Sequence, residues 1–142
     1  MSEQREVPRA VRDIIGKKYP PVTHDVEKGA IRRFAEAVGD PNPRWQKEAL
    51  PTFLCSLSAE GDPLDPLGRL DHPYKRRLHG SSEWEYLQPV RPGDVLTVQN
   101  SVVDAAMKPG RLGAMLFVTT ETTFLNREGQ LVVKQRHTII YY

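Results

Sequence analysis

The stretch Gly39-Asp40-Pro41-Asn42-Pro43-Arg44-Trp45 follows directly on a helical pattern and places two prolines among turn-forming residues. Glycine often ends a helix, because it adopts a left-handed backbone without strain. Asp and Asn favour turns, because their side chains accept hydrogen bonds from nearby backbone N–H groups. The stretch therefore predicts a helix end at Gly39 and a proline-punctuated turn after it. Trp45 closes the turn with an indole N–H that only donates hydrogen bonds, so Trp45 cannot act as an acid or base.

The residues before this stretch have the period of an amphipathic helix. Apolar side chains recur at i, i+3, i+4 and i+7, namely Ile31, Phe34, Ala35 and Val38. The opposite face is charged, which predicts that the helix lies on the surface and buries this one stripe. We expect Asp25 to cap its N-terminus.

A second helical candidate runs from Leu50 to about Glu60 and is apolar on most sides. Pro51 is tolerated in a first helical turn, and a helix that is apolar on most sides is buried. A proline inside a helix costs about 3 kcal/mol, so the prolines and glycines from Gly61 to Gly68 make a longer helix unfavourable. The sequence therefore predicts a short, buried helix.

Four segments after residue 82 have the alternation and composition of strands: residues 83–87, 95–104, 114–125 and 130–142. Asn126-Arg127-Glu128-Gly129 predicts a hairpin between the last two strands, with Gly129 at a positive φ. Sequential antiparallel strands after a buried helix predict an α+β fold. In this fold, the helix at 50–60 covers one face of the sheet.

The composition fits one globular domain. The 142 residues are 39% apolar and 27% charged, and 20 basic and 18 acidic residues give a net charge of +2. Charges this balanced and dispersed do not favour nucleic-acid binding. No apolar run approaches the roughly 20 residues of a membrane span, and the charged residues 1–6 are not typical of a secretory signal. Cys55 is the only cysteine, so no internal disulfide can form, and no Cys/His spacing indicates a metal site. We therefore expect a cytoplasmic protein without metal.

The stretch at 39–45 resembles the Gly-Asp-x-Asn-Pro-x-His signature of the MaoC-like hydratases and dehydratases, which add or remove water at acyl thioesters. In that family the Asp and the His five residues later form the acid/base pair. Asp40 matches the Asp, but Trp45 stands at the position of the His. The resemblance therefore implies that Asp40 is the one catalytic residue that remains of the pair.

The resemblance extends over nearly the whole chain. Its further segments are Asp13–Lys17, Phe34–Asp40, Pro51–Phe53, Leu78–Tyr86 with Pro89–Asp94, and Asn126–Gly129. It implies a single hotdog domain at 13–142, in which an antiparallel sheet wraps around a short central helix. Residues 1–12 are expected to form a flexible N-terminus.

Within that family, the chain is most similar to the substrate-binding halves of two-part dehydratases, in which a second hotdog domain supplies the Asp/His pair. This implies a subunit of a 3-hydroxyacyl-CoA dehydratase or enoyl-CoA hydratase that binds a coenzyme A thioester and needs no further cofactor. Its expected partner is a catalytic MaoC-like subunit or, without one, a second copy of this chain. The alternative is a standalone acyl-CoA thioesterase or a non-catalytic acyl-CoA-binding protein, since a hotdog fold supports either.

The resemblance also suggests a set of substrate-binding residues: Asn42, Trp45, Phe53, Cys55, His79, Trp84 and Tyr86. Each has a structural alternative. Asp40 and Asn42 can simply form the turn, Trp45 and Cys55 can pack in the core, and His79 can simply begin a strand. The basic run Lys75-Arg76-Arg77 is either solvated surface or a contact for coenzyme A phosphates.

The short helix at 50–60 leaves two possibilities for the sheet face that it covers. A wide cavity lined by Trp84 or Tyr86 would admit a bulky or branched acyl group. Alternatively, the proline-rich loop after the helix folds back and fills the gap.

Overall fold

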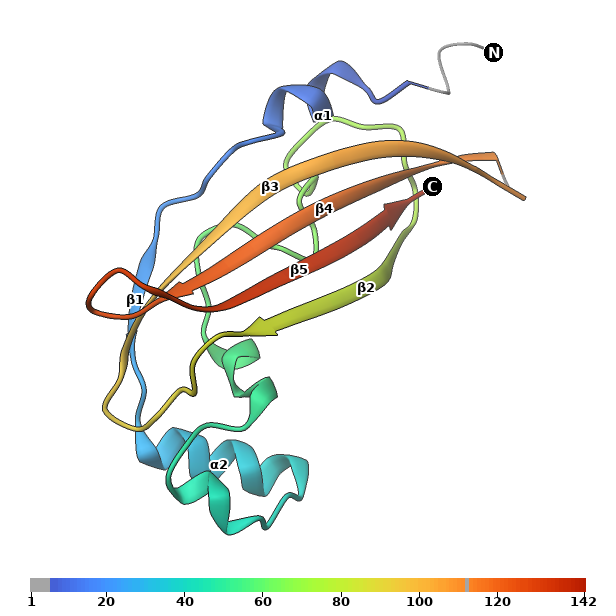
Figure 1. The fold of residues 1–142 in the computed structure, drawn as a ribbon. Coiled ribbons are helices and arrows are strands. Elements are labelled where there is room, and N and C mark those ends of the chain that lie inside the picture. The colour runs from blue at the N-terminus through green and yellow to red at the C-terminus, as the bar shows by residue number, and fades with distance from the viewer. Residues whose placement is uncertain (1–5, 112) are drawn as a thin grey trace.

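The computed structural model describes residues 6–111 and 113–142, and its main feature is one antiparallel sheet in the strand order β1-β3-β4-β5-β2 (Figure 1). The strands are β1 (Val22–Asp25), β2 (Arg77–Tyr86), β3 (Val95–Gly110), β4 (Gly113–Leu125) and β5 (Leu131–Tyr141). The α+β fold and the four predicted strands are confirmed, and Gly129 has the expected positive φ of 75°. Strand β1 was not predicted.

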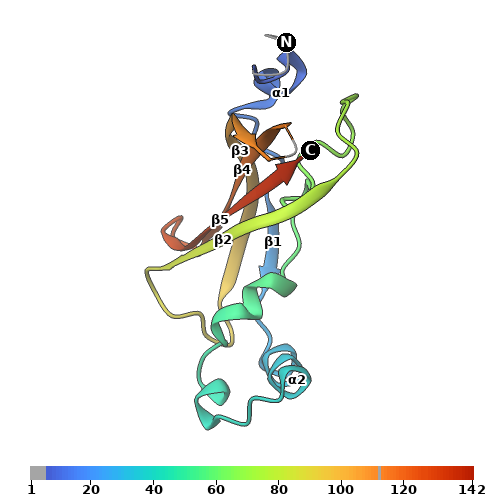
Figure 2. The same ribbon diagram turned by 90° about the vertical axis from the view of Figure 1, so that its right-hand side faces the viewer.

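Helix α2 (Lys28–Val38) confirms the predicted helix and ends at Gly39, whose φ is 73°. The predicted cap is wrong. Asp25 is the last residue of β1 and pairs with Val95, while Glu27 occupies the N-cap position without a side-chain hydrogen bond. The predicted burial of Val38 is also wrong, because its side chain is 55% exposed. Figure 2 shows why: α2 lies beyond one end of the sheet, so only part of its apolar stripe meets the core.

The buried helix predicted at 50–60 is replaced by a single short 3₁₀ helix, η3 (Pro51–Ser56). It follows a second one, η2 (Pro43–Gln46). Leu57 is already extended, and the Ser56 hydroxyl donates to the Phe53 carbonyl over 2.6 Å, which satisfies a carbonyl that a longer helix would use. The helix buries Phe53 and Leu54 but leaves Cys55 exposed.

One face of the sheet packs against α2 and η3, and the strand register divides the side chains of this face into layers. The lower layer, next to α2 and η3, is an apolar cluster that includes Leu96, Val98, Phe124 and Val133. The upper layer is a second apolar cluster that includes Val102, Leu116, Val118 and Ile139. Between them lies a belt of buried polar side chains: Asn100, Thr120, Thr122, Gln135 and His137.

Residues 57–76, which we call the strap, cross this face without a helix or strand (Figure 1). The strap carbonyl of Glu60 accepts a hydrogen bond from Asn100, and that of Pro63 accepts one from Thr120. Leu67 of the strap is fully buried in the upper cluster. Of the two possibilities for this face, the structure therefore has the loop that folds back and packs on the sheet.

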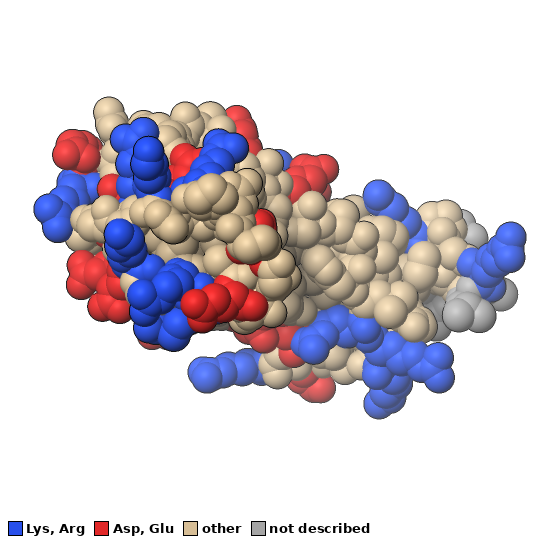
Figure 3. All heavy atoms as spheres, turned by 90° about the horizontal axis from the view of Figure 1, so that it is seen from below, with Lys and Arg blue, Asp and Glu red and all other residues tan. Residues whose placement is uncertain are grey.

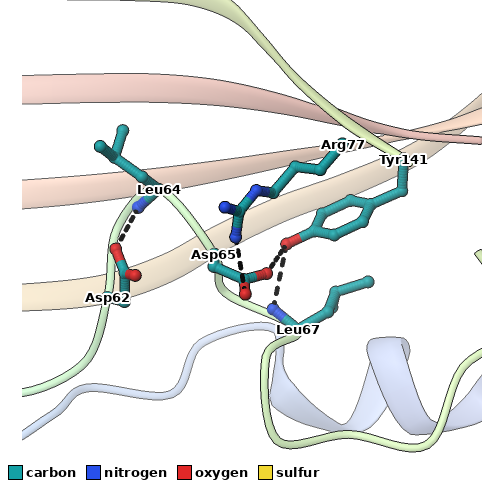
Figure 4. A network of polar contacts seen from close by, with 6 residues as sticks. All are labelled: Asp62, Leu64, Asp65, Leu67, Arg77 and Tyr141. Atoms are coloured by element: carbon teal, nitrogen blue, oxygen red, sulfur yellow. Dashed lines mark hydrogen bonds and ion pairs between the residues drawn. The ribbon is translucent and has the colours of Figure 1, made fainter. Parts of the chain in front are cut away.

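The strap is anchored by a polar network at the ends of β2 and β5 (Figure 4). Asp65 accepts a hydrogen bond from the Tyr141 hydroxyl over 2.7 Å and pairs with the Arg77 guanidinium over 2.6 Å. The same hydroxyl accepts from the Leu67 backbone N–H over 3.3 Å. The network thus holds the middle of the strap against the sheet.

The N-terminal part of the chain is partly structured. Residues 1–5 of the segment expected to be flexible lie outside the described residues. From Arg9 the chain forms helix α1 (Arg9–Ile14), and its Val11 is fully buried in the upper cluster. Among the residues that the structure describes, no helix is long and apolar enough to cross a membrane.

Candidate functional site

Asp40 and Asn42 build the turn between α2 and η2 with their own side chains. The Asp40 N–H donates to the Ala35 carbonyl five residues earlier, which closes the helix end after Gly39, and the Asp40 Oδ1 accepts from the Asn42 N–H over 3.1 Å. Asn42 Oδ1 accepts in turn from the Arg44 N–H over 3.0 Å and so caps η2. Both side chains therefore carry out the structural task that the sequence offered as the alternative to ligand binding.

Trp45 follows this turn and packs, half-buried, against the lower apolar cluster. The backbone N–H of Trp45 donates to the Asn42 carbonyl over 3.2 Å. The Arg44 guanidinium lies over the indole at 5.8 Å from its centroid and is itself paired with Glu48. The indole Nε1 is buried and has no hydrogen-bond partner in the structure. The ring is thus held by the backbone and by Arg44, without a polar contact of its own.

Two pockets adjoin Trp45. The first, which we call the α2 pocket, has a volume of about 450 Å³ and is lined by α2 and by the turn that carries Asp40 and Asn42. The second, the β2 pocket, has a volume of about 430 Å³ and lies between η3 and the end of β2, where Tyr86 lines it. Among the residues that the structure describes, Trp45 is the one that lines both pockets.

The aromatic residues of β2 connect that strand to η3. Trp84 stacks on Tyr86 and on Phe124, with ring centroids 5.9 and 6.2 Å apart. The Tyr86 hydroxyl donates to the Pro51 carbonyl over 2.6 Å, and Phe53 meets Phe34 edge to face. These contacts fix one wall of the β2 pocket.

Cys55 lies exposed on η3, not in the core. Partial desolvation raises the pKa of its thiol, an effect that a backbone hydrogen bond at Cys55 opposes. The thiol is therefore protonated at neutral pH and is a weak nucleophile.

His79 lies apart from the other candidates, at the opposite end of β2. Its Nε2 is 3.1 Å from His137 Nδ1 on β5. His137 is only 8% exposed, and its burial, together with the charge of His79, lowers the pKa of its imidazole. His137 had no predicted role. Its contact with His79 depends on the register of β2, which the local pattern of β5 does not reveal.

The structure thus brings Asp40, Asn42 and Trp45 together and connects them, through the β2 pocket, to Tyr86. His79 is separate. The roles of all these residues in ligand binding stay predictions.

Charged side chains around the site carry both signs. The sequence placed Lys28 and Arg32 on the solvated face of the helix, but both line the α2 pocket, as does Glu36. Figure 3, which views the molecule from the end that carries α2, shows basic and acidic side chains beside one another. In the basic run at 75–77, Arg77 is occupied by its ion pair with Asp65. Within residues 6–111 and 113–142, no three His, Cys, Asp or Glu side chains are grouped so that they could hold a metal ion.

The sequence of the chain was compared with protein-family models and with known proteins. The model of the FAS1-like dehydratase domain region matches residues 13–135. A UPF0336 protein of Thermobifida fusca is 33% identical over 138 residues, which cover 86% of this chain and 87% of that protein.

The solved structures that share the fold include the following three. A chain of the ChsH1–ChsH2 complex from Mycobacterium tuberculosis is 21% identical with a TM-score of 0.80, covering 94% of this chain and 89% of its own. A chain of the HadBC (3R-hydroxyacyl-ACP dehydratase) complex from the same organism is 22% identical with a TM-score of 0.67, at coverages of 87% and 92%. The MaoC-like dehydratase from Rhodospirillum rubrum is 22% identical with a TM-score of 0.63, at 93% and 95%. The family model, which spans most of the chain, and the fold shared with these structures together show that the chain belongs to the FAS1-like dehydratase region family and has the MaoC-like hotdog fold.

Proposed function

We propose that this chain is the degenerate subunit of a cytoplasmic 3-hydroxyacyl-CoA dehydratase or enoyl-CoA hydratase. It contributes part of the acyl-thioester pocket, and a second hotdog subunit supplies the acid and the base. The observation that carries the proposal is Trp45, which stands at the position of the family's histidine and is wedged between two pockets.

Removal of water from a 3-hydroxyacyl thioester needs a base that takes the α-proton and an acid that protonates the departing hydroxyl. Indole supplies neither. Asp40, the other half of the family's pair, accepts the Asn42 N–H through Oδ1 and so helps to form the turn. The motif of this chain is therefore suited to shape the pocket, and the proton transfers fall to the partner.

The exposed edge of β2 is suited to receive that partner. β2 pairs with β5 on one side only, and all its residues are exposed except the half-buried Trp84. Leu78 and Tyr86, at opposite ends of the strand, are 52% and 44% exposed. An unpaired edge with apolar side chains is a template for another strand. The ChsH1–ChsH2 and HadBC structures, which share the fold, are complexes, and this supports a paired assembly here.

The charges along β2 favour an antiparallel approach of a similar strand. The strand is preceded by Lys75 and Arg76, and its other end carries Glu83 and Glu85. Antiparallel pairing of two such strands places the basic end of each beside the acidic end of the other. A second copy of this chain is therefore the expected partner when the catalytic subunit is absent.

The test is an enoyl-CoA hydration assay, followed by the absorbance of the enoyl thioester. We expect the chain alone to be slower than its complex with a MaoC-like subunit that has an intact Asp and His, by about 10²–10⁴-fold, the usual contribution of an acid/base group. The complex should keep its activity when Asp40 is changed to Asn. Asp62→Asn is the matched control, because Asp62 forms the same kind of turn with the Leu64 N–H. Turnover by the chain alone that Asp40→Asn abolishes and Asp62→Asn preserves would overturn the proposal.

A further inference from the structure

The α2 pocket and the β2 pocket differ in their walls. The α2 pocket has charged side chains at its rim, with Lys28 and Arg32 one helical turn apart. The β2 pocket is walled mainly by apolar groups, among them Leu50, Leu54 and Val90. The walls of both pockets are nonetheless more apolar than polar, so each pocket can accept part of an apolar chain.

Trp45 separates the two pockets and is fixed in place. Its backbone is bonded to the Asn42 carbonyl, and Asn42 itself caps η2. One side of the ring packs on the lower apolar cluster, and Arg44, held by Glu48, lies over the ring. A side chain restrained on this many sides acts as a wall, not as a mobile gate.

The unpaired indole nitrogen supports this interpretation. A buried donor without a partner costs about 1–3 kcal/mol. A phenyl ring would fill much of the same space without that cost, so the position is occupied by a large ring in spite of its polar atom.

We propose that Trp45 determines the length of the acyl chain that this subunit accepts, because it closes the passage between the β2 pocket and the α2 pocket. The inference rests on the proposed function, since it takes the ligand to be an acyl thioester. The acyl chain enters the β2 pocket along Tyr86 and Leu54 and ends against the indole. Loss of the ring joins the two pockets and admits a longer chain.

The experiment measures the affinity of saturated straight-chain acyl-CoA thioesters, from butyryl to palmitoyl, by calorimetry on the purified chain and on its complex. Each methylene that enters an apolar pocket improves Kd by about fourfold, and a methylene that finds no space adds nothing. For the wild type we expect the gain to stop at one chain length. Trp45→Phe keeps a large ring and removes the N–H, so its gain should stop at the same length. Trp45→Ala should continue to gain about fourfold per methylene beyond that point.

Trp45→Leu covers the case in which Trp45→Ala does not fold, since it keeps apolar packing but shortens the wall. Thermal melts identify the folded variants. If Trp45→Ala and Trp45→Leu stop gaining at the same length as Trp45→Phe, the inference is overturned.

A crystal structure of Trp45→Ala separates this inference from the proposed function. One continuous cavity supports the role of Trp45 as a wall, and two separate pockets or a collapsed site contradict it, whatever the ligand. If the cavity is continuous but the protein binds none of the thioesters, the inference that Trp45 separates the pockets holds and the proposed function is refuted.

Discussion

The two halves of the covered sheet face are closed by different means. The lower half is covered by α2 and η3, whose apolar side chains Ile31, Phe53 and Leu54 enter one cluster. The upper half is covered by the strap, which is held by the carbonyls of Glu60 and Pro63 and by Leu67. The comparison shows that a sheet face can be covered even where prolines prevent the covering segment from forming a helix. An irregular segment covers the face when the sheet offers polar side chains to pair with its backbone.

The largest effect should come from Leu67, where the strap meets the upper cluster. Leu67→Ala should lower the free energy of unfolding by about 2–5 kcal/mol, because a fully buried leucine is lost and a cavity remains. Urea denaturation measures the change. Leu64→Ala is the matched control, since Leu64 lies on the same strap but is 46% exposed, and it should change stability by less than about 0.5 kcal/mol. Equal effects of the two substitutions would show that the strap is not part of the core.

The next effect should come from the network that anchors the strap. Tyr141→Phe removes the donor to Asp65 and the acceptor of the Leu67 N–H, and it should cost about 1–3 kcal/mol in urea denaturation. Burial, with the Asp65 hydrogen bond, raises the pKa of Tyr141, so the hydroxyl stays a donor over the ordinary pH range. Tyr74→Phe is the control, because the Tyr74 hydroxyl makes only a 3.8 Å contact with the Met107 sulfur. A Tyr141→Phe variant as stable as Tyr74→Phe would contradict the anchoring role.

Sequence periodicity predicts the strands well where one face is buried. The predicted bounds of 114–125 and 130–142 agree with β4 and β5 to within one residue. β2 was predicted from residue 83, although it begins at Arg77, because an edge strand exposed on both faces shows no alternation over its first half. β1 is four residues long and follows two prolines, so it is too short to show a period.

The candidate site was predictable only in its local part. The turn at Asp40 and Asn42 follows from side-chain chemistry within a few residues. The contact of His79 with His137 depends on a register shift between His79 and Ser81, which no local pattern reveals. The place of Trp45 between two pockets depends in the same way on how the end of β2 packs against η2 and η3.

In the lower half, the turn at Asn42 allows a smaller and more local test. Asn42→Ala removes the acceptor that caps η2 and should lower the free energy of unfolding by about 1 kcal/mol. Asn42→Asp keeps an acceptor at the same place and should lose much less. Thermal or urea denaturation compares the two. An alanine variant as stable as the aspartate variant would show that the turn is held by its prolines and not by this side chain.

The smallest effect that we expect is a pH dependence of stability from the polar belt between the two halves. Burial, and to a smaller extent the charge of His79, lowers the pKa of His137 in the folded protein. In the unfolded chain the imidazole titrates near its ordinary pKa of about 6.5. Between the folded and unfolded pKa values, the unfolded chain binds more protons, so the free energy of unfolding rises with pH in this window. The stabilising contribution is complete above about pH 6.5 and is lost as the pH falls through the folded-state pKa.

Urea denaturation at a series of pH values below and above about 6.5 tests this prediction. His137→Gln should flatten the slope in that window, because the titrating group is gone. His79→Gln should only reduce the slope, since it removes the smaller cause of the shift and leaves the burial of His137 in place. If the His137→Gln variant keeps the slope of the wild type, the imidazole is protonated equally in the folded and unfolded chains. The belt would then be accessible to water and would not be a sealed layer between two apolar clusters.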